Sequence, residues 1–329
     1  MKGPPSFMSR FQGPAGLNSR LALIFYLIGR LSAVDARAQS PSVGSAAPMS
    51  PCIPNCRSLE ALSGPEVEAE IDRMAEAVRR DIESATDRPT KIQVLNRFFF
   101  TASGFRPLRE DTPESILPRT VLDRRQGNCL GLSIVYLALA RDLDLPVQAV
   151  AAPNHLFLRY SDGDLRVNLE LLEGGLSHED DYYLKQYRIP SDSVRRGVFL
   201  RSLSDREVLG HVYFSLGANY SKNGDFNSSF ALYQAAVRDA PDAPTAHLNL
   251  GQDLLARDRA KEAVREFTTA LRLYPGYLSA LSARSTAQCR LGNLRKARKD
   301  LETILDLSPE SQSAAKTLAG LECPPEGPH

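Results

Sequence analysis

The sequence predicts an α+β domain in the first half of the chain and an all-α repeat solenoid in the second half. Pro241, Pro275 and Pro309 recur at a spacing of 34 residues, and the residues before them repeat in phase. Upstream of these repeats, apolar residues at helical spacing give way to runs that alternate like strands. A chain of 329 residues has room for roughly two domains of ~150 residues each. We therefore expect a mixed domain at 58–203 and a repeat array at 204–321.

Each repeat is predicted to form a helix, a turn and a second helix. A small residue such as Gly217 lets two helices approach closely, and Gly224 marks the turn between them. Each proline ends the second helix, because its ring cannot continue the helical hydrogen bonds. The pattern resembles the tetratricopeptide repeat, and such arrays hold partners, so we expect any chemistry upstream. The three units and a short capping helix are predicted near 210–243, 244–277, 278–311 and 311–321.

The upstream domain combines helices with a sheet. Helical stripes of apolar residues lie near 66–85 and 92–104, and an almost continuous apolar run after Cys129 predicts a buried helix that begins there. Apolar and polar residues then alternate in three segments, which predicts an antiparallel hairpin and a third strand. These segments lie near 147–151, 155–160 and 165–171.

Cys129 is the residue best placed for chemistry, because it stands at the predicted helix start with Asn128 as the N-cap. A helix N-terminus carries about half a positive charge and unpaired N–H groups, which favour a nucleophilic thiolate and can hold an oxyanion. His155 begins the middle strand, and Asn168 and Glu170 share one face of the next strand. A nucleophile, a base and an orienting group in this order are typical of a thiol triad.

A longer stretch around this cysteine resembles a known family. Segments 121–133, 136–140 and 145–147 look like the transglutaminase-like superfamily, in its bacterial branch with C-terminal tetratricopeptide repeats. The resemblance covers about residues 66–200. It implies a papain-like core, in which a helix bearing the nucleophile packs on an antiparallel sheet bearing the histidine and an acidic residue.

Transferred to this sequence, the resemblance makes Cys129 the nucleophile and His155 the base. The superfamily usually has aspartate at the third position, where this chain has Glu170, with Asn168 as the alternative. Gln126 is a weaker candidate for an oxyanion donor. The implied reaction is acyl transfer or hydrolysis at amide or peptide bonds through a thioester, with no cofactor.

Two other interpretations stay open at the level of sequence. Several relatives in this branch keep the fold but lack the nucleophile, so the domain could be a silent scaffold that assembles complexes through its repeats. A weaker third hypothesis makes the protein a regulator whose Cys129 thiol senses redox state.

The concave face of the repeats predicts a surface for a protein or peptide partner. Its lining is mixed and nearly uncharged, which favours a neutral or amphipathic segment over a peptide carboxylate. A net charge of +1 gives no sign of the basic surface that nucleic-acid-binding proteins carry, so no nucleic-acid partner is expected. The residues predicted to line this face are Phe214, Ala218, Leu248, Asn249, Gln252, Ser282 and Thr286.

The N-terminus resembles a secretory signal. Basic residues precede the apolar run 21–28, and an Ala-Arg-Ala sequence ends at Ala38, which predicts a signal peptide at 1–38. The run is too short for the ~20 apolar residues of a membrane span, so no transmembrane anchor is expected. We expect export to the periplasm or cell envelope, or a cytoplasmic location if this imperfect signal is not used. Residues 39–57 form a predicted flexible linker, and 322–329 a tail.

Cys52 and Cys56 flank a short loop and could form a disulfide in an oxidising compartment. A metal site is less favoured, because no other cysteine pair has ligand spacing and histidine is scarce.

Overall fold

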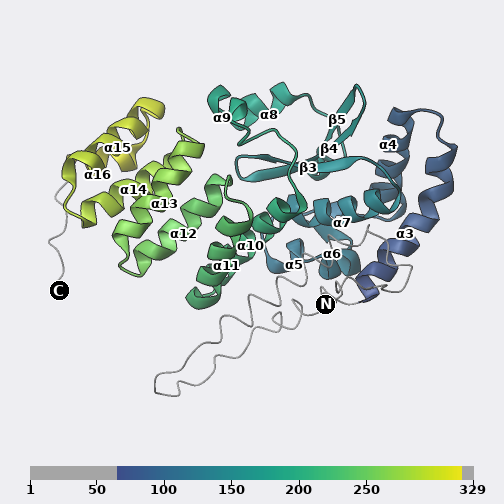
Figure 1. Ribbon diagram of the computed structural model, residues 1–329, viewed down its shortest axis with the longest axis horizontal. Coiled ribbons are helices and arrows are strands. Elements are labelled where there is room, and N and C mark those ends of the chain that lie inside the picture. Colours follow the sequence, from purple (N-terminus) through teal and green to yellow (C-terminus); the bar gives the residue numbers. More distant parts are fainter. Residues whose placement is uncertain (1–64, 321–329) are drawn as a thin grey trace, which may run out of the picture.

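The computed structural model describes residues 65–320. A domain of helices and a sheet leads into a row of paired helices (Figure 1). This arrangement confirms the predicted fold class, an α+β core followed by an all-α solenoid. Outside the described residues lie the predicted signal segment 1–38, the linker 39–57, the tail 322–329 and the cysteines Cys52 and Cys56.

Helix α7 (Cys129–Asp142) is the centre of the first domain, and all of its residues from 130 to 137 are buried. It packs against α3 and α6 on one side and against the sheet on the other. The surrounding helical segments are α3 (Pro65–Ser84), α4 (Arg88–Asn96), the π-helical turn η2 (Arg97–Ala102), α5 (Pro113–Ile116), α6 (Pro118–Arg124), the 3₁₀ turn η3 (Leu171–Glu173), α8 (Asp180–Gln186) and α9 (Ser191–Arg195).

The main sheet is antiparallel, with strand order β3-β4-β5. Its strands are β3 (Val147–Ala152), β4 (His155–Asp162) and β5 (Leu165–Leu169), at the three positions that alternation predicted. Ala152 pairs with His155 across a tight turn, and Arg159 pairs with Asn168 across the second ladder. A small parallel pair joins β1 (Arg106–Pro107) to β2 (Gln126–Gly127) just before α7.

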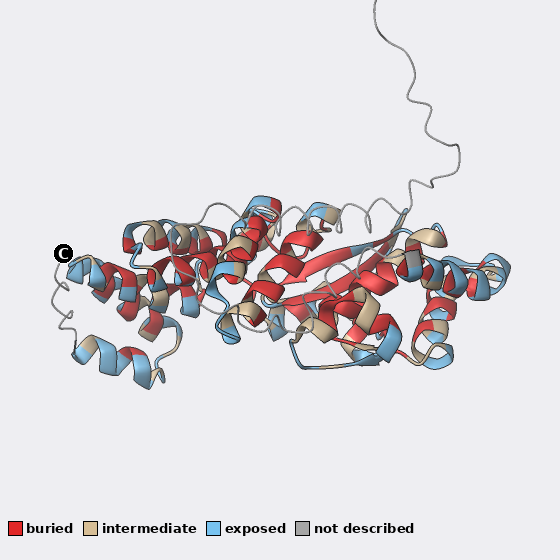
Figure 2. Ribbon diagram, turned by 90° about the horizontal axis from the view of Figure 1, so that it is seen from below, coloured by how far each residue is buried: buried red, intermediate tan, exposed pale blue. Residues whose placement is uncertain are grey.

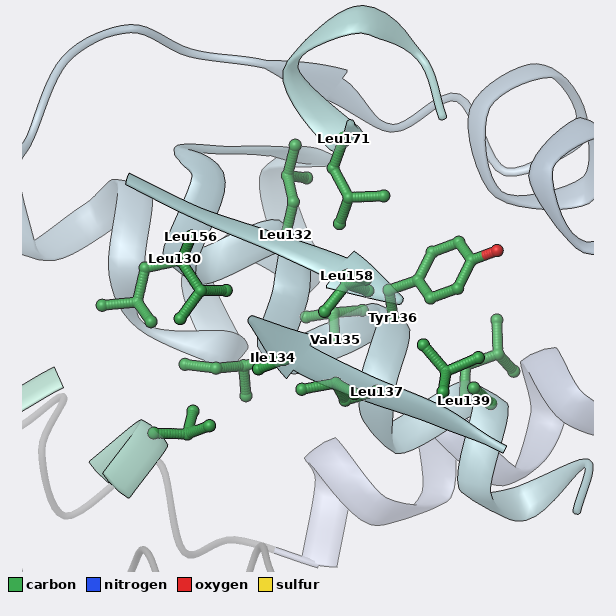
Figure 3. Packing of buried hydrophobic residues seen from close by; sticks show 14 of the residues in the cluster. Leu130, Leu132, Ile134, Val135, Tyr136, Leu137, Leu139, Leu156, Leu158 and Leu171 are labelled. Atoms are coloured by element: carbon green, nitrogen blue, oxygen red, sulfur yellow. The ribbon is translucent and has the colours of Figure 1, made fainter. Parts of the chain in front are cut away.

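Leucine and valine side chains fill the space between α7 and the sheet (Figure 3). Leu132 and Val135 of α7 face Leu158 of β4 in this layer, and all three are at most 1% exposed. Gly131 lets α5 approach the first turn of α7, because a Cβ there would lie 2.1 Å from the Ser115 carbonyl oxygen. Any side chain at that position would move the start of α7, and with it Cys129.

The repeat array consists of antiparallel helix pairs. The second helix of each pair ends two residues before Pro241, Pro275 or Pro309, as the proline spacing predicted. Gly217 allows close packing within the first pair, since a Cβ there would lie 2.7 Å from the Tyr233 ring. The helices are α10 (Asp205–Lys222), α11 (Phe226–Asp239), α12 (Pro244–Ala256), α13 (Ala260–Leu273), α14 (Leu278–Arg290), α15 (Leu294–Leu307) and α16 (Gln312–Ala319).

The hydrophobic core crosses the boundary that the sequence placed at residue 204. One cluster of buried residues joins α7 and the sheet to Val208, Leu209, Val212 and Tyr213 of α10. Buried residues continue from the domain into the helices of the array (Figure 2). Because it shares this core, the first repeat is structurally part of the preceding domain. The proline period did not predict this, since it marks the spacing of the repeats and carries no information about burial.

Candidate active site

Cys129 is the first residue of α7, and its side chain is a free, partly exposed thiol. The Asn128 side chain caps the helix by accepting a hydrogen bond from the Gly131 N–H at 2.9 Å. The Asn128 N–H is itself used, because it donates to the Ser115 carbonyl at 2.9 Å. Among the described residues, the N–H groups of Cys129 and Leu130 therefore have no hydrogen-bond acceptor.

His155 opens β4, where only 8% of the residue is exposed. Its Nε2 atom lies 2.7 Å from the Glu170 carboxylate, and its ring stacks on Tyr187 at 5.2 Å between centroids. Cys129 also hydrogen-bonds to the imidazole. Because Glu170 occupies Nε2, we infer that Nδ1 is the nitrogen that faces the sulfur.

The charge of His155 follows from these two neighbours. Burial by itself would lower the pKa of the imidazole, since it penalises the charged form. The hydrogen bonds and negative charges of Cys129 and Glu170 outweigh burial and raise the pKa of His155 to about 9. The ring therefore carries a proton near neutral pH and places a positive charge beside the sulfur of Cys129.

Of the two candidates for the third position, Glu170 reaches the histidine and Asn168 does not. Glu170 lies just beyond β5, is 3% exposed and caps η3 by accepting from the Leu172 N–H at 3.1 Å. Asn168 stands opposite Arg159 in the sheet, and its side-chain oxygen accepts from Arg159 Nε at 2.7 Å. The amide of Asn168 donates to Asp180, so this side chain belongs to a network behind the site.

Cys129 and His155 open onto a cleft of about 370 Å³. One wall comes from the start of α7, the β3–β4 turn and the loop around Leu108. The opposite wall comes from the repeat array, through α10 and the beginning of α12. The site is thus built between the two parts of the chain.

Comparisons with known proteins agree with this architecture. A family model described as the transglutaminase-like superfamily matches residues 65–213, and a tetratricopeptide-repeat model matches residues 214–277. The chain carries a transglutaminase-like domain followed by tetratricopeptide repeats. It is 22% identical over 213 residues to a UPF0162 protein from Xylella fastidiosa (strain 9a5c), which covers 62% of this chain and 75% of the relative.

Two solved structures are similar over different lengths of the chain. The first tetratricopeptide domain of Spaghetti (RPAP3), bound to an HSP90 peptide, is 25% identical and covers 34% of this chain and 89% of its own, with a TM-score of 0.33. A crystal structure of menin, described by its binding site for Mixed Lineage Leukemia protein, is 13% identical and covers 89% of this chain and 73% of its own, with a TM-score of 0.48.

The residues predicted for the concave face of the repeats are not all in one place. Phe214, Ala218 and Asn249 line the cleft that contains Cys129. Exposed side chains at Gln252, Ser282 and Thr286 continue the array surface outside that cleft. Leu248 must be removed from the predicted groove, because it is only 6% exposed and packs in the second hydrophobic cluster.

Gln126, the weaker oxyanion candidate, lies in β2 and is not among the residues that line the cleft. The N–H groups of Cys129 and Leu130, which have no acceptor among the described residues, are better placed to hold an oxyanion, because both residues line the cleft.

Sequence reasoning missed His211, which lines the cleft from α10 and lies 4.9 Å from the Phe214 ring between centroids. A signal was available, because residues three apart on a helix share a face and Phe214 was already predicted to face the groove.

Within residues 65–320, no three His, Cys, Asp or Glu side chains gather as a metal site. No helix in the same range is long and apolar enough to cross a membrane.

Proposed function

We propose that this protein is a cysteine-dependent acyltransferase or hydrolase that acts on amide or peptide bonds through a thioester. The observation that carries the proposal is the contact of Cys129 with His155 at one cleft, together with the contact of His155 with the buried Glu170. The transglutaminase-like domain supports it, and the repeats add a surface for a protein partner.

The proposed reaction has two halves. In the first, Cys129 Sγ attacks the carbonyl carbon while its proton resides on His155, and the tetrahedral intermediate expels the amine, which takes that proton. The product is a thioester on Cys129. In the second half, water or another amine gives a proton to His155 and attacks the thioester. The tetrahedral intermediate releases the acid or new amide and expels the Cys129 sulfur as a thiolate, while the proton stays on His155, which restores the starting state.

Three features of the site serve this reaction. Glu170 holds the imidazole through Nε2 and stabilises its positive charge. The unpaired N–H groups of Cys129 and Leu130 can donate to the oxyanion, and the α7 dipole adds to this stabilisation. Loss of one such donor typically costs about 10²–10³ in rate.

The first test is alkylation of Cys129 by iodoacetamide, followed by mass spectrometry of the cysteine peptide. At about pH 7, His155→Ala should slow this alkylation by at least about ten-fold, because the imidazolium no longer stabilises the thiolate. His178→Ala is the matched control, since His178 pairs with Glu173 at 2.7 Å and lies outside the cleft lining. Equal rates in wild type and His155→Ala would reject an activated thiol.

Turnover itself is tested by trapping an acyl-enzyme on Cys129 from a cell-envelope extract, with Cys129→Ala as the control. A trapped acyl group supports the enzyme and identifies its donor. Fast, His155-dependent alkylation without any acyl-enzyme would favour the redox-sensing hypothesis instead.

A scaffold that assembles complexes is the second candidate, and one observation favours it. Helices α14 and α15 expose Leu278, Leu294 and Leu307 at 39%, 43% and 51%, and none of the three lines the cleft. A contiguous apolar patch on these helices would mark a protein contact, whereas single exposed leucines are common on any protein surface. If Cys129→Ala fully complements a deletion strain, the scaffold is the better description.

We also propose that the protein is exported to the periplasm or cell envelope, on the strength of the signal-like segment at 1–38. Mass spectrometry of the native protein should find a mature N-terminus at Gln39. An intact Met1 would reject cleavage.

A further inference from the structure

We propose that the first two repeats form the substrate-selecting wall of the active site, and that this wall takes an uncharged peptide segment with an apolar group beside the reacting carbonyl. The inference rests on the proposed acyl-transfer function and adds the substrate class. It changes the role of the repeats from a separate docking module to one half of the site.

The walls of the cleft belong to both parts of the chain. Cys129 and His155 lie on the transglutaminase-like side, and Phe214, Ala218 and Asn249 lie on the repeat side of the same 370 Å³ space. A substrate that fills this space therefore contacts α10 and α12 as well as the thiol. The volume lies at the lower end of the usual range for ligand pockets, roughly 300–1,000 Å³, and suits a side chain with its flanking peptide groups.

The repeat wall presents polar groups that lack partners in the protein. The imidazole of His211 and the carboxamide of Asn249 make no hydrogen bond within the described residues, and both are only partly exposed. Burial lowers the pKa of His211 to about 4, so the ring is neutral and can donate through one nitrogen and accept through the other. Peptide amides offer the matching acceptor and donor.

The lack of charge on the repeat wall indicates which kinds of substrate it disfavours. None of the residues that line the cleft from α10 and α12 is a Lys, Arg, Asp or Glu. The charged residues at the cleft, Arg109 and Asp111, come from the loop after β1, and Asp111 accepts a hydrogen bond from Asn128. Lys222 at the end of α10 acts electrostatically on Asp111 but does not line the cleft. A substrate carboxylate or ammonium would therefore find no counter-charge among the α10 and α12 residues that line the cleft, whereas a benzyl or aliphatic group would meet Phe214 and Ala218.

The test compares two neutral electrophiles on the full-length protein. Iodoacetamide is small and reports the thiol, while N-benzyl iodoacetamide carries a ring into the cleft. In both cases Cys129 Sγ displaces iodide and forms a thioether, and the rate ratio of the two probes at Cys129 is measured by mass spectrometry. Taking the ratio cancels any effect of a variant on the reactivity of the thiol itself, because such an effect changes the rates of both probes equally.

Phe214→Ala should lower the benzyl-to-parent ratio about five-fold, the size expected from losing one aromatic contact. Phe226→Ala is the matched control, because Phe226 is a 55% exposed phenylalanine on α11. Ala218→Phe should also lower the ratio by filling the cleft, with Ala256→Phe at an exposed position of α12 as its control. The second variant keeps the test valid if loss of Phe214 unfolds the protein.

Unchanged ratios in both cleft variants, with folding intact by circular dichroism, would overturn the inference. The proposed function fails in a different way, through iodoacetamide rates that do not depend on His155. The two ideas are therefore judged by separate readouts from the same samples.

Discussion

Glu170 uses both of its carboxylate oxygens, one on His155 and the other on the Leu172 N–H. It stands one residue beyond the end of β5, at the start of the η3 turn. An aspartate is one methylene shorter, so from this backbone position it would hold one of the two partners less well. The geometry accounts for glutamate where the superfamily usually has aspartate.

The raised pKa of His155 makes stability depend on pH. Between its ordinary value of 6.5 and about 9, the folded protein holds a proton that the unfolded chain has lost. The stabilisation is fully present below 6.5, worth about 3 kcal/mol, and is lost as pH rises through about 9. Glu170→Gln should remove much of this dependence, as measured by urea unfolding at several pH values.

The control for this experiment is Glu173→Gln, which removes a carboxylate from the more exposed pair with His178. It should leave the pH dependence close to that of wild type. A Glu170→Gln variant with the wild-type slope would contradict the assignment of the raised pKa to this pair.

At the residue scale, the sequence predicted those candidate catalytic residues that stand at the start of a helix or strand. Cys129 follows an N-cap asparagine and precedes an apolar run, and His155 follows a tight turn. His211 was missed although its spacing from Phe214 was a signal, because the cleft that it lines is completed by distant parts of the chain.

The turn between β3 and β4 ties His155 to the repeat array. Asn154 adopts the left-handed conformation with φ 54°, and its side-chain oxygen accepts from Thr245 Oγ1 at 3.1 Å and from the Tyr277 hydroxyl at 3.4 Å. Thr245 is the second residue of α12, and Tyr277 directly precedes α14. The two ends of the second repeat, 244–277, thus both contact the residue next to the candidate base.

A double-mutant cycle between Asn154→Gly and Thr245→Val tests this contact. Asn154→Gly keeps the left-handed backbone and removes both hydrogen bonds of the Asn154 side chain, whereas Thr245→Val keeps the shape and removes the Thr245 bond, so the coupling isolates the contact between the two residues. We expect each to cost about 1 kcal/mol of unfolding free energy, with a coupling of about 0.5–1 kcal/mol. Strictly additive effects would show that the two residues do not interact.

At the element scale, local patterns were sufficient for α7 and for the three strands, because α7, β3 and β4 are buried along most of their length and β5 alternates apolar and polar residues. They did not predict α8 and α9, which are short and owe their positions to distant partners. Tyr183 of α8 stacks on Phe157 of β4 at 3.8 Å between centroids, and Ser193 of α9 donates to the Leu273 carbonyl at 2.9 Å. Such contacts leave no periodic signal in the chain.

At the scale of the whole molecule, the repeats and the domain share one core and one cleft. Arg141 of α7 donates to Asp205 at the start of α10 at 3.0 Å, and Val208 and Leu209 continue the core behind it. A 34-residue period in the sequence divides the chain at a point where the folded protein has no break. The active cleft lies at this shared region, which explains why both parts contribute to its walls.

Truncation should reveal this shared core. A chain that ends at residue 203 loses Val208, Leu209, Val212, Tyr213 and Leu216, all at most 4% exposed. Each such side chain is worth about 1.5–3 kcal/mol, and their sum approaches the whole stability of a domain, about 5–15 kcal/mol. We expect residues 58–203 alone to bind a hydrophobic dye and to melt without cooperativity. A chain that ends at 243 keeps α10 and α11 and should unfold cooperatively in circular dichroism, whereas a cooperative melt of the shorter fragment would mean that the domain folds without the repeats.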